Sequence, residues 1–250
     1  MLFCGIDLSF SSKNSSALVF IKDHAGIGEV ISLFTLRSLE DIIEAILSFL
    51  PLGKIFIAID APLVILNEKG ERQIDAMVNK IFRKYHAGVY PINRNIIRKI
   101  SDFQVEKLLW SLVKVGFNFL KKVDFSENTI FETVVSASIV NLFNLERSLK
   151  YKAKKGRSLN LRYEEFKKYQ KYIKKLENYT PSIYIPVEIL SKDIENLKGK
   201  KLKEYEDILD AIICAYTAYH FWYHKGRESL ILSDLNSIIV IPKRQKWINF

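Results

Sequence analysis

Five acidic residues stand in or directly after hydrophobic segments, where carboxylates are not expected for packing reasons. Aspartate is disfavoured inside strands, yet two aspartates end strand-like runs. Two more are three residues apart in a helix-like run, so they share one helix face. Carboxylates that gather in one place repel one another unless a cation neutralises them. The five residues are Asp7, Asp60, Glu132, Asp207 and Asp210.

Mg²⁺ or Mn²⁺ is the cation that this set of side chains suits. Both ions prefer oxygen ligands, whereas zinc sites are built mainly from Cys and His. The chain has two cysteines and four histidines, and no histidine has metal-ligand spacing to another acid or cysteine. Each carboxylate taken singly has a structural alternative, such as capping a turn or pairing with a lysine. The combination of all five favours a metal site.

Short apolar runs near the N-terminus predict the strands that would carry two of these aspartates. Three runs joined by short turns predict an antiparallel meander. A helix follows, with Ser38 as its N-cap and Asp41 at the capping-box spacing, and it ends at Pro51. A fourth run is apolar almost throughout, as in strands buried on both faces. The four strand candidates are LFCGID (2–7), SALVFIKD (16–23), GEVISLFTL (28–36) and KIFIAID (54–60).

Two more strands and a long apolar helix are predicted later in the chain. If the first and fourth strands are parallel neighbours, Asp7 and Asp60 emerge at one edge of the sheet, where α/β proteins form their sites. The Asp-x-x-Asp pair lies in the first turns of the helix, where the helix dipole favours carboxylates. These later elements are TIFETV (129–134), the helix 203–224 and SIIVIP (237–242).

The pattern predicts one α/β domain over residues 1–250. Mainly helical insertions are expected at about 67–122 and 144–180, and the first of them contains helix candidates at 70–85 and 102–120. The absence of an internal repeat or a low-complexity linker favours one domain with insertions over two domains.

The net charge of +10 is concentrated in one segment. Residues 146–175 contain twelve basic and three acidic side chains, with tyrosines interleaved among them. Such a concentration is expected where a polyanion such as nucleic acid binds. A solvated, lysine-rich helix face is an equally good explanation of the segment taken alone.

The composition excludes several classes of protein. With 48% hydrophobic and 26% charged residues over 250 positions, the chain can bury a sizeable core and is not disordered. Cys4 and Cys214 are too few for a disulfide framework, which favours a reducing cytoplasm, and the apolar context of Cys214 predicts a core residue. No segment offers ~18 uninterrupted apolar residues for a membrane span, and the N-terminus lacks the basic region of a secretory signal. We expect a cytoplasmic protein without membrane insertion.

An ordered set of motifs spans nearly the whole chain: GID (5–7), AIDAPL (58–63), GERQID (70–75), YP (90–91), FETVVSAS (131–138), KAKKGR (152–157) and DILDAIICAYTA (207–218). This set resembles the family called domain of unknown function 429, whose members are described as predicted nucleases. The resemblance implies an RNase H-like fold of the RuvC type, with three antiparallel strands, then helix, strand, strand and helix. The closing DILDA segment is especially similar to the RuvC branch.

The resemblance implies metal-dependent hydrolysis of phosphodiester bonds in nucleic acid. Two metal ions ~3.5–4 Å apart would clamp the scissile phosphate. Asp7 would bridge them, because the first strand is central in such folds, and Asp60 and Asp210 would hold one ion each. Asp207 or Glu132 would complete the ligand set. Phosphate contacts are expected from Lys154, Lys155 and Arg157.

Arg72, Asp75 and Arg94 form a second candidate group, in GERQID and VYPINRN. One hypothesis is a lid whose arginines grip phosphate while Asp75 orients one of them. The structural alternative, which the spacing slightly favours, is an ordinary Arg–Asp pair on an exposed helix.

Two other functions compete with a nuclease. An actin-like phosphotransferase or ATPase shares the core topology but needs Gly-rich phosphate loops, and no Gly-rich turn follows Asp7 or Asp60. A non-catalytic nucleic-acid-binding or assembly module is the stronger alternative, and the complete carboxylate set argues against it. Recognition of branched nucleic acid would favour a homodimer.

Overall fold

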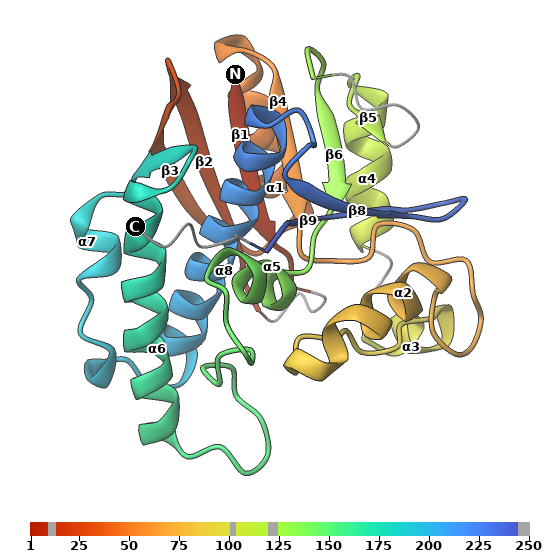
Figure 1. Ribbon diagram of the computed structural model, residues 1–250. Helices are drawn as coiled ribbons and strands as arrows, with labels where there is room; N and C mark the ends of the chain where they lie inside the picture. Colours follow the sequence, from red (N-terminus) through yellow and green to blue (C-terminus); the bar gives the residue numbers. More distant parts are fainter. Residues whose placement is uncertain (10–13, 101–103, 120–124, 245–250) are drawn as a thin grey trace.

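A mixed sheet forms the centre of the protein in the computed structural model, which describes residues 1–9, 14–100, 104–119 and 125–244 (Figure 1). The strand order is β7-β3-β2-β1-β4-β6-β9-β8, and β5 pairs with β6. Strands β1 to β3 are antiparallel, whereas β1, β4, β6 and β9 run parallel. The strands are β1 Leu2–Asp7, β2 Ser16–His24, β3 Ile27–Leu36, β4 Ile55–Ile59, β5 Asn118–Phe119, β6 Thr129–Glu132, β7 Ser182–Tyr184, β8 Ser229–Ser233 and β9 Ile238–Pro242.

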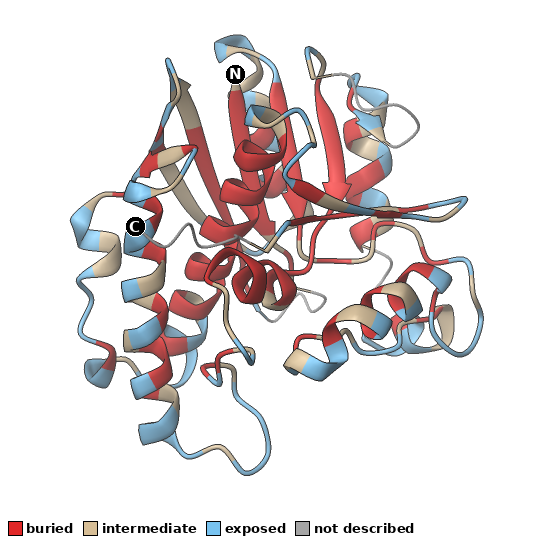
Figure 2. Ribbon diagram, viewed as in Figure 1, coloured by how far each residue is buried: buried red, intermediate tan, exposed pale blue. Residues whose placement is uncertain are grey.

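Helices pack on both faces of this sheet. Apolar residues of α5, α6 and α8 form one core layer with the first face, and residues of α1 and α4 form a second layer with the other face. The central strands β1, β4 and β6, α5 and most of α8 are buried, whereas α2, α3 and α6 expose one side (Figure 2). The helices are α1 Leu39–Ser48, α2 Gln73–Phe82, α3 Arg94–Ile100, α4 Gln104–Lys114, α5 Val135–Leu142, α6 Leu159–Lys174, α7 Val187–Leu190 and α8 Gly199–Tyr223.

Strand alternation decides which face each residue of β1 reaches. Leu2, Cys4 and Ile6 belong to the layer with α1 and α4, whereas Phe3 belongs to the layer with α8. Successive side chains of a strand point to opposite faces. Asp7, two positions after Gly5, therefore lies on the α8 side of the sheet.

Gly5 lets α8 lie directly on β1. A Cβ atom at this position would be 2.1 Å from the carbonyl oxygen of Ala211 and 2.1 Å from the amide nitrogen of Ala215. Only glycine allows two backbones to approach this closely. The contact fixes the height of α8 above the strand and brings the acidic turn of the helix to the end of β1.

The N-terminal half follows the pattern expected from the sequence. The meander and the parallel pairing of β1 with β4 are as predicted. The Oγ of Ser38 accepts a hydrogen bond from the Asp41 amide at 3.0 Å, so the predicted cap of α1 is confirmed. Cys4 and Cys214 are buried free thiols, and the prediction that Cys214 is a core residue is confirmed.

Several elements differ from the expectation, among them strand β7, which pairs with β3 and was not predicted. The predicted helix 102–120, whose ends lie outside the described residues, stops at Lys114, because Gly116 has φ +93° and the Phe117 amide turns back to the Leu112 carbonyl. The long helix begins at Gly199 rather than at 203. Strand β8, which pairs with β9, was not predicted. Every helix in the described part of the chain is too short or too polar to cross a lipid bilayer.

Candidate functional site

Three of the predicted carboxylates meet at the end of the central strands. Asp7 ends β1 and Asp60 follows β4, whose register pairs Ile6 with Ile59. The Asp60 amide donates to the Ile6 carbonyl at 3.0 Å, so the two strand ends stay together for one more residue. Asp7 and Asp60 both interact electrostatically with Asp210 on α8. The sheet edge and the helix thus converge on one acidic group.

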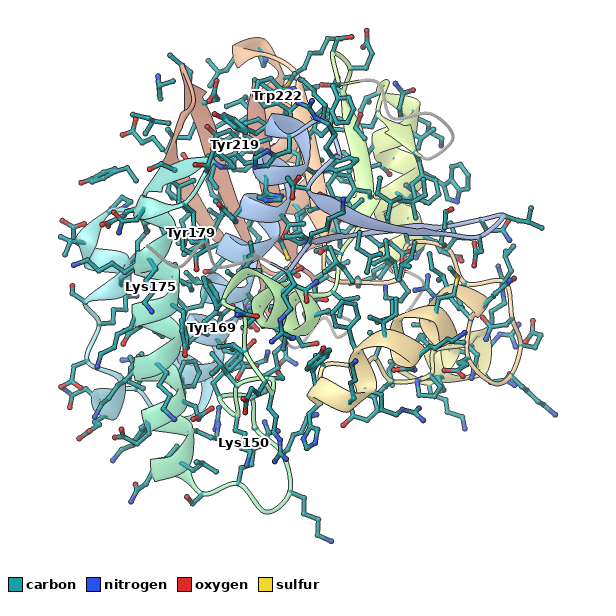
Figure 3. The ribbon with its side chains drawn as sticks, viewed as in Figure 1. Lys150, Tyr169, Lys175, Tyr179, Tyr219 and Trp222 are labelled. Carbon is teal, nitrogen blue, oxygen red and sulfur yellow. The ribbon has the colours of Figure 1, made fainter. Side chains whose placement is uncertain are left out.

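Asp210 is held by three donors from the segment that joins α5 to α6 and from α6 itself. The hydroxyls of Tyr151 and Tyr169 donate to its Oδ1 at 2.7 and 3.0 Å. The ammonium of Lys152 lies 2.7 Å from its Oδ2. Tyr169 points from α6 toward α8 (Figure 3). Asp210 is fully buried, so its position is set by these contacts.

The acidic group carries more negative charge than its partners neutralise. Burial, and then Asp210, raise the pKa of Asp7 well above its usual value, whereas Lys152 opposes the rise. Burial also raises the pKa of Asp60, against the effect of Lys152. Burial lowers the pKa of Lys152, but Asp210 and Asp60 outweigh it, so the pKa ends well above the usual value. Asp207 and Lys203 also act on the group. The four aspartates against the ammonium groups of Lys152 and Lys203 leave two negative charges when all are ionised.

These side chains fit a divalent cation in chemistry and in charge. The Oδ2 atom of Asp7 is buried and has no hydrogen-bond partner among the described residues, and a buried acceptor of this kind needs a proton or a cation. All of the donors would be oxygens, as Mg²⁺ and Mn²⁺ prefer. Across the described residues, no three Asp, Glu, His or Cys side chains are already placed as a ligand set, and Lys152 is bound to Asp210.

Asp207 lies beside this group but is paired with a lysine. Lys203 contacts both Asp207 and Glu206, the latter at 2.8 Å. The negative charge of Asp207 also raises the pKa of Asp7. Because α8 begins at Gly199, Asp207 and Asp210 lie about two and three turns into the helix, so the prediction that the helix dipole stabilises them is wrong.

Glu132 is not part of the acidic group. Its register partner in β4 is Ile59, whose side chain belongs to the layer with α1 and α4. Paired residues of neighbouring strands point to the same face, so Glu132 points away from α8. The Leu63 amide donates to its Oε1 at 2.8 Å, and Arg72 binds both of its oxygens at 2.8 and 2.9 Å. Of the two candidates for a last ligand, the position of Asp207 is the better one.

Arg72 is a buried structural residue rather than a phosphate-binding one. Its guanidinium donates to Asp75 twice, to Glu132 twice and to the Val64 carbonyl once. These bonds use all five N–H groups of an arginine. The predicted pairing with Asp75 is present, but it is buried and not exposed. Neither the phosphate grip nor the exposed pair describes this arginine.

The remaining predicted basic residues lie on both sides of the site. Arg94 binds the Ile65 carbonyl at 2.8 Å and lies 3.7 Å from Glu106, so it supports the loop after β4. Lys154 and Lys155 are exposed, and Lys154 lies 5.0 Å from the centre of the Tyr90 ring. Arg157 binds the Lys152 carbonyl at 3.0 Å.

The tyrosines interleaved with the basic residues face inward. Tyr151, Tyr163 and Tyr169 are buried in the core layer under α6, while the lysines of α6 face solvent. Figure 3 labels Lys150 near the start of this basic segment and Lys175 at its end. Much of the charge of 146–175 is therefore the solvated face of an amphipathic helix, and the part that reaches the site is the stretch 150–157.

Comparison with protein families identifies the chain. A family model described as "Protein of unknown function (DUF429)" matches residues 5–234. The chain belongs to the DUF429 family. A search of curated proteins gives no match. The match runs from Gly5 to beyond α8, so Asp7, Asp60 and Asp210 of this DUF429 protein all lie inside it.

Sequence reasoning missed the residues that hold the carboxylates. Lys152 begins KAKKGR, a segment that stands out in the sequence for its later basic residues. Gly5 begins GID, which stands out for Asp7. Tyr151 and Tyr169 were counted only as aromatic residues in a basic segment. A glycine next to a strand-end aspartate was the one available signal, because glycine inside a strand marks a close backbone approach.

Proposed function

We propose that this DUF429 protein hydrolyses phosphodiester bonds of nucleic acid with the help of Mg²⁺ or Mn²⁺. The carrying observation is the meeting of Asp7, Asp60 and Asp210 beside Lys152, with a buried oxygen of Asp7 that has no hydrogen-bond partner among the described residues. Such an excess of buried negative charge costs stability in a protein that does not use it. Perturbed carboxylates beside a cleft are typical of catalytic sites.

Asp7, Asp60 and Asp210 would hold the cations, with Asp207 completing the set. Cations bound there would activate a water molecule and stabilise the leaving oxygen. Asp7 is the best candidate for a shared ligand, because β1 lies between β2 and β4 in the middle of the sheet. Lys154 and Arg157 would bind backbone phosphates and so hold the strand in place without reading its sequence.

The topology supports assignment to the RNase H-like folds. Three antiparallel strands are followed by two that extend the sheet in parallel on the far side of β1, in the order β3-β2-β1-β4-β6. The acidic helix α8 packs across β1. The family resemblance implies an arrangement of this kind, and acids that end β1, follow β4 and lie on α8 support the assignment.

Cleavage assays test the proposal directly. Labelled single-stranded, duplex, RNA–DNA hybrid and branched substrates are incubated with the protein and Mg²⁺ or Mn²⁺. We expect cleavage of at least one substrate, and a loss of at least about a hundredfold in Asp7→Asn or Asp210→Asn, because each variant removes a ligand. Asp41→Asn, at an exposed position of α1, is the matched control and should cleave like the wild type.

A metal-binding measurement separates lost ligands from a damaged fold. Mn²⁺ should raise the melting temperature of the wild type, because a ligand that binds only the folded state stabilises it. Asp7→Asn should abolish this rise but should be at least as stable as the wild type in EDTA, since it removes a buried charge. Cleavage that survives Asp7→Asn, or a wild type that cleaves nothing, would refute the nuclease.

A non-catalytic nucleic-acid-binding module is the second candidate. The lysine pairs favour it: Lys152 binds Asp210, and Lys203 binds Asp207, so protein cations already neutralise part of the acidic group. In that case the melting temperature would not respond to Mn²⁺, while nucleic acid would still bind to the basic segment.

A further inference from the structure

A cleft opens beside the carboxylates, between the loop that precedes α3 and the segment that joins α5 to α6. Its volume is about 510 Å³, within the range of small-ligand sites. Asp60 and Lys152 both line it. Because the same two residues interact with Asp210, the cleft is continuous with the acidic group.

One wall of the cleft is apolar and open to solvent. Tyr90 is 76% exposed, and Pro91 and Ile96 beside it are exposed as well. Contiguous exposed apolar side chains mark binding surfaces more often than they occur by chance. A solvent-facing aromatic ring in a cleft is the platform on which nucleic-acid bases stack.

The opposite wall is basic and is fixed in place. The Ser148 amide donates to the Tyr85 carbonyl at 2.7 Å, which ties this segment to the end of α2. Arg157 binds the Lys152 carbonyl, so the loop folds back on itself. The ammonium of Lys154 lies over the Tyr90 ring. A base-stacking wall and a phosphate-binding wall thus face each other.

We infer that the cleft binds one unpaired nucleotide of a nucleic-acid strand. The base lies against Tyr90 and Ile96, and the phosphates lie toward Lys154 and Arg157. This inference rests on the proposed function, because the carboxylates at the end of the cleft would then stand beside the linkage of the bound nucleotide. A base inside an intact duplex is stacked and paired and does not reach such a pocket, so the strand must be single or locally opened.

Binding without cleavage tests the inference. Fluorescence anisotropy in EDTA measures the affinity for a labelled single strand, for the blunt duplex of the same sequence, and for an abasic strand with the same phosphates. The single strand should bind at least about fivefold more tightly than either of the other two. Tyr90→Ala should lower the affinity for the single strand by at least about fivefold and leave the abasic strand unaffected.

Two further variants control this experiment. Tyr90→Trp keeps a stacking surface and should retain the affinity. Tyr184→Ala removes another exposed tyrosine, 55% exposed in β7 and outside the cleft, and should have no effect. Tighter binding of the duplex, or a Tyr90→Ala protein that binds like the wild type, would overturn the inference.

The inference and the proposed function fail in different ways. Cleavage that depends on Asp7 but is indifferent to Tyr90 would keep the nuclease and reject the nucleotide cleft. Strand binding that depends on Tyr90, together with no cleavage by the wild type, would keep the cleft and reject the nuclease.

Discussion

Arg72 shows how a single buried side chain holds the loop after β4 in place. It joins Asp75 of α2 to Glu132 of β6 and is only 7% exposed. Burial alone would lower the pKa of the Arg72 guanidinium. The carboxylates of Glu132 and Asp75 outweigh this effect and raise the pKa above its usual value. Removing one member of such a group leaves buried charge without a partner.

Arg72→Met should therefore lower the free energy of unfolding by about 3–5 kcal/mol, measured by urea denaturation. Adding Glu132→Gln should recover part of the loss, because an amide is cheaper to bury than an unpaired carboxylate. Lys167→Ala, which breaks exposed pairs with Glu164 and Glu195, is the control and should change stability little. An Arg72→Met protein as stable as this control would contradict the structural role.

His220 predicts a pH dependence that is independent of the acidic group. Burial, and to a smaller extent His224, lower its pKa to about 3 from the usual 6.5. Between these values the unfolded chain binds a proton that the folded protein does not, so stability falls as the pH falls below about 6.5. The loss is about 1.4 kcal/mol per pH unit.

Urea unfolding at pH 7, 6 and 5 measures this effect. Between pH 7 and pH 5 the wild type should lose about 2 kcal/mol more than His220→Gln does. His24→Gln, at an exposed position of β2, should retain the wild-type slope. Equal slopes in wild type and His220→Gln would show that His220 does not cause the dependence.

At the scale of elements, the contact of α8 with β1 assembles the site. Gly5 allows the helix backbone to touch the strand, and the next acidic turn of α8 then reaches the end of β1. Tyr151, Lys152 and Tyr169 reach Asp210 from the other side of the helix. The site therefore depends on a packing distance between two elements that are about 200 residues apart in the chain.

Gly5→Ala should separate these two elements. Its Cβ would overlap the backbone of α8, so the helix must move, and we expect a loss of about 3 kcal/mol or more in unfolding free energy. The rise in melting temperature with Mn²⁺ should be lost too, because Asp210 moves away from Asp7. Gly70 has φ +74°, and a Cβ atom added there would meet no other described residue within 4 Å, its chain neighbours aside. Gly70→Ala should therefore lower the unfolding free energy by only about 1 kcal/mol. Similar losses in the two variants would contradict the close packing.

At the scale of the whole molecule, basic charge is divided between two surfaces. The loop before α6 carries Lys154 and Lys155 beside the cleft, whereas Lys171 and Lys174 lie on the solvent face of α6. The net charge of +10 would attract the proposed nucleic-acid partner to both groups of lysines. Only contacts in the bound complex add to the salt dependence of affinity.

A matched pair of double variants distinguishes site-specific contacts from net charge. Lys154→Gln with Lys155→Gln and Lys171→Gln with Lys174→Gln lower the net charge equally. The first pair should reduce the slope of log affinity against log salt by about 1.4 for a single strand, or ~0.7 for each lost contact. The second pair should change it little, as measured by anisotropy over a salt series. Equal effects would mean that binding follows overall charge alone.

Much of the fold and part of the site were determined by the sequence alone. The meander, the capped α1 and the strand-end positions of Asp7 and Asp60 follow from short-range patterns of apolar residues and turns. The alternation of side chains along β1 already places Asp7 on the same face of the sheet as Phe3 and Gly5. Local propensity and strand alternation need no information from distant parts of the chain.

Only the tertiary structure decided which distant side chains meet. The register of β6 against β4 turned Glu132 to the face opposite α8, where Arg72 binds it. The backbone contact at Gly5 set the height of α8, and the loop before α6 placed Lys152 on Asp210. Register and packing distance join residues far apart in sequence, and a shift of one residue in a strand reverses the face of every side chain. No local pattern encodes that choice.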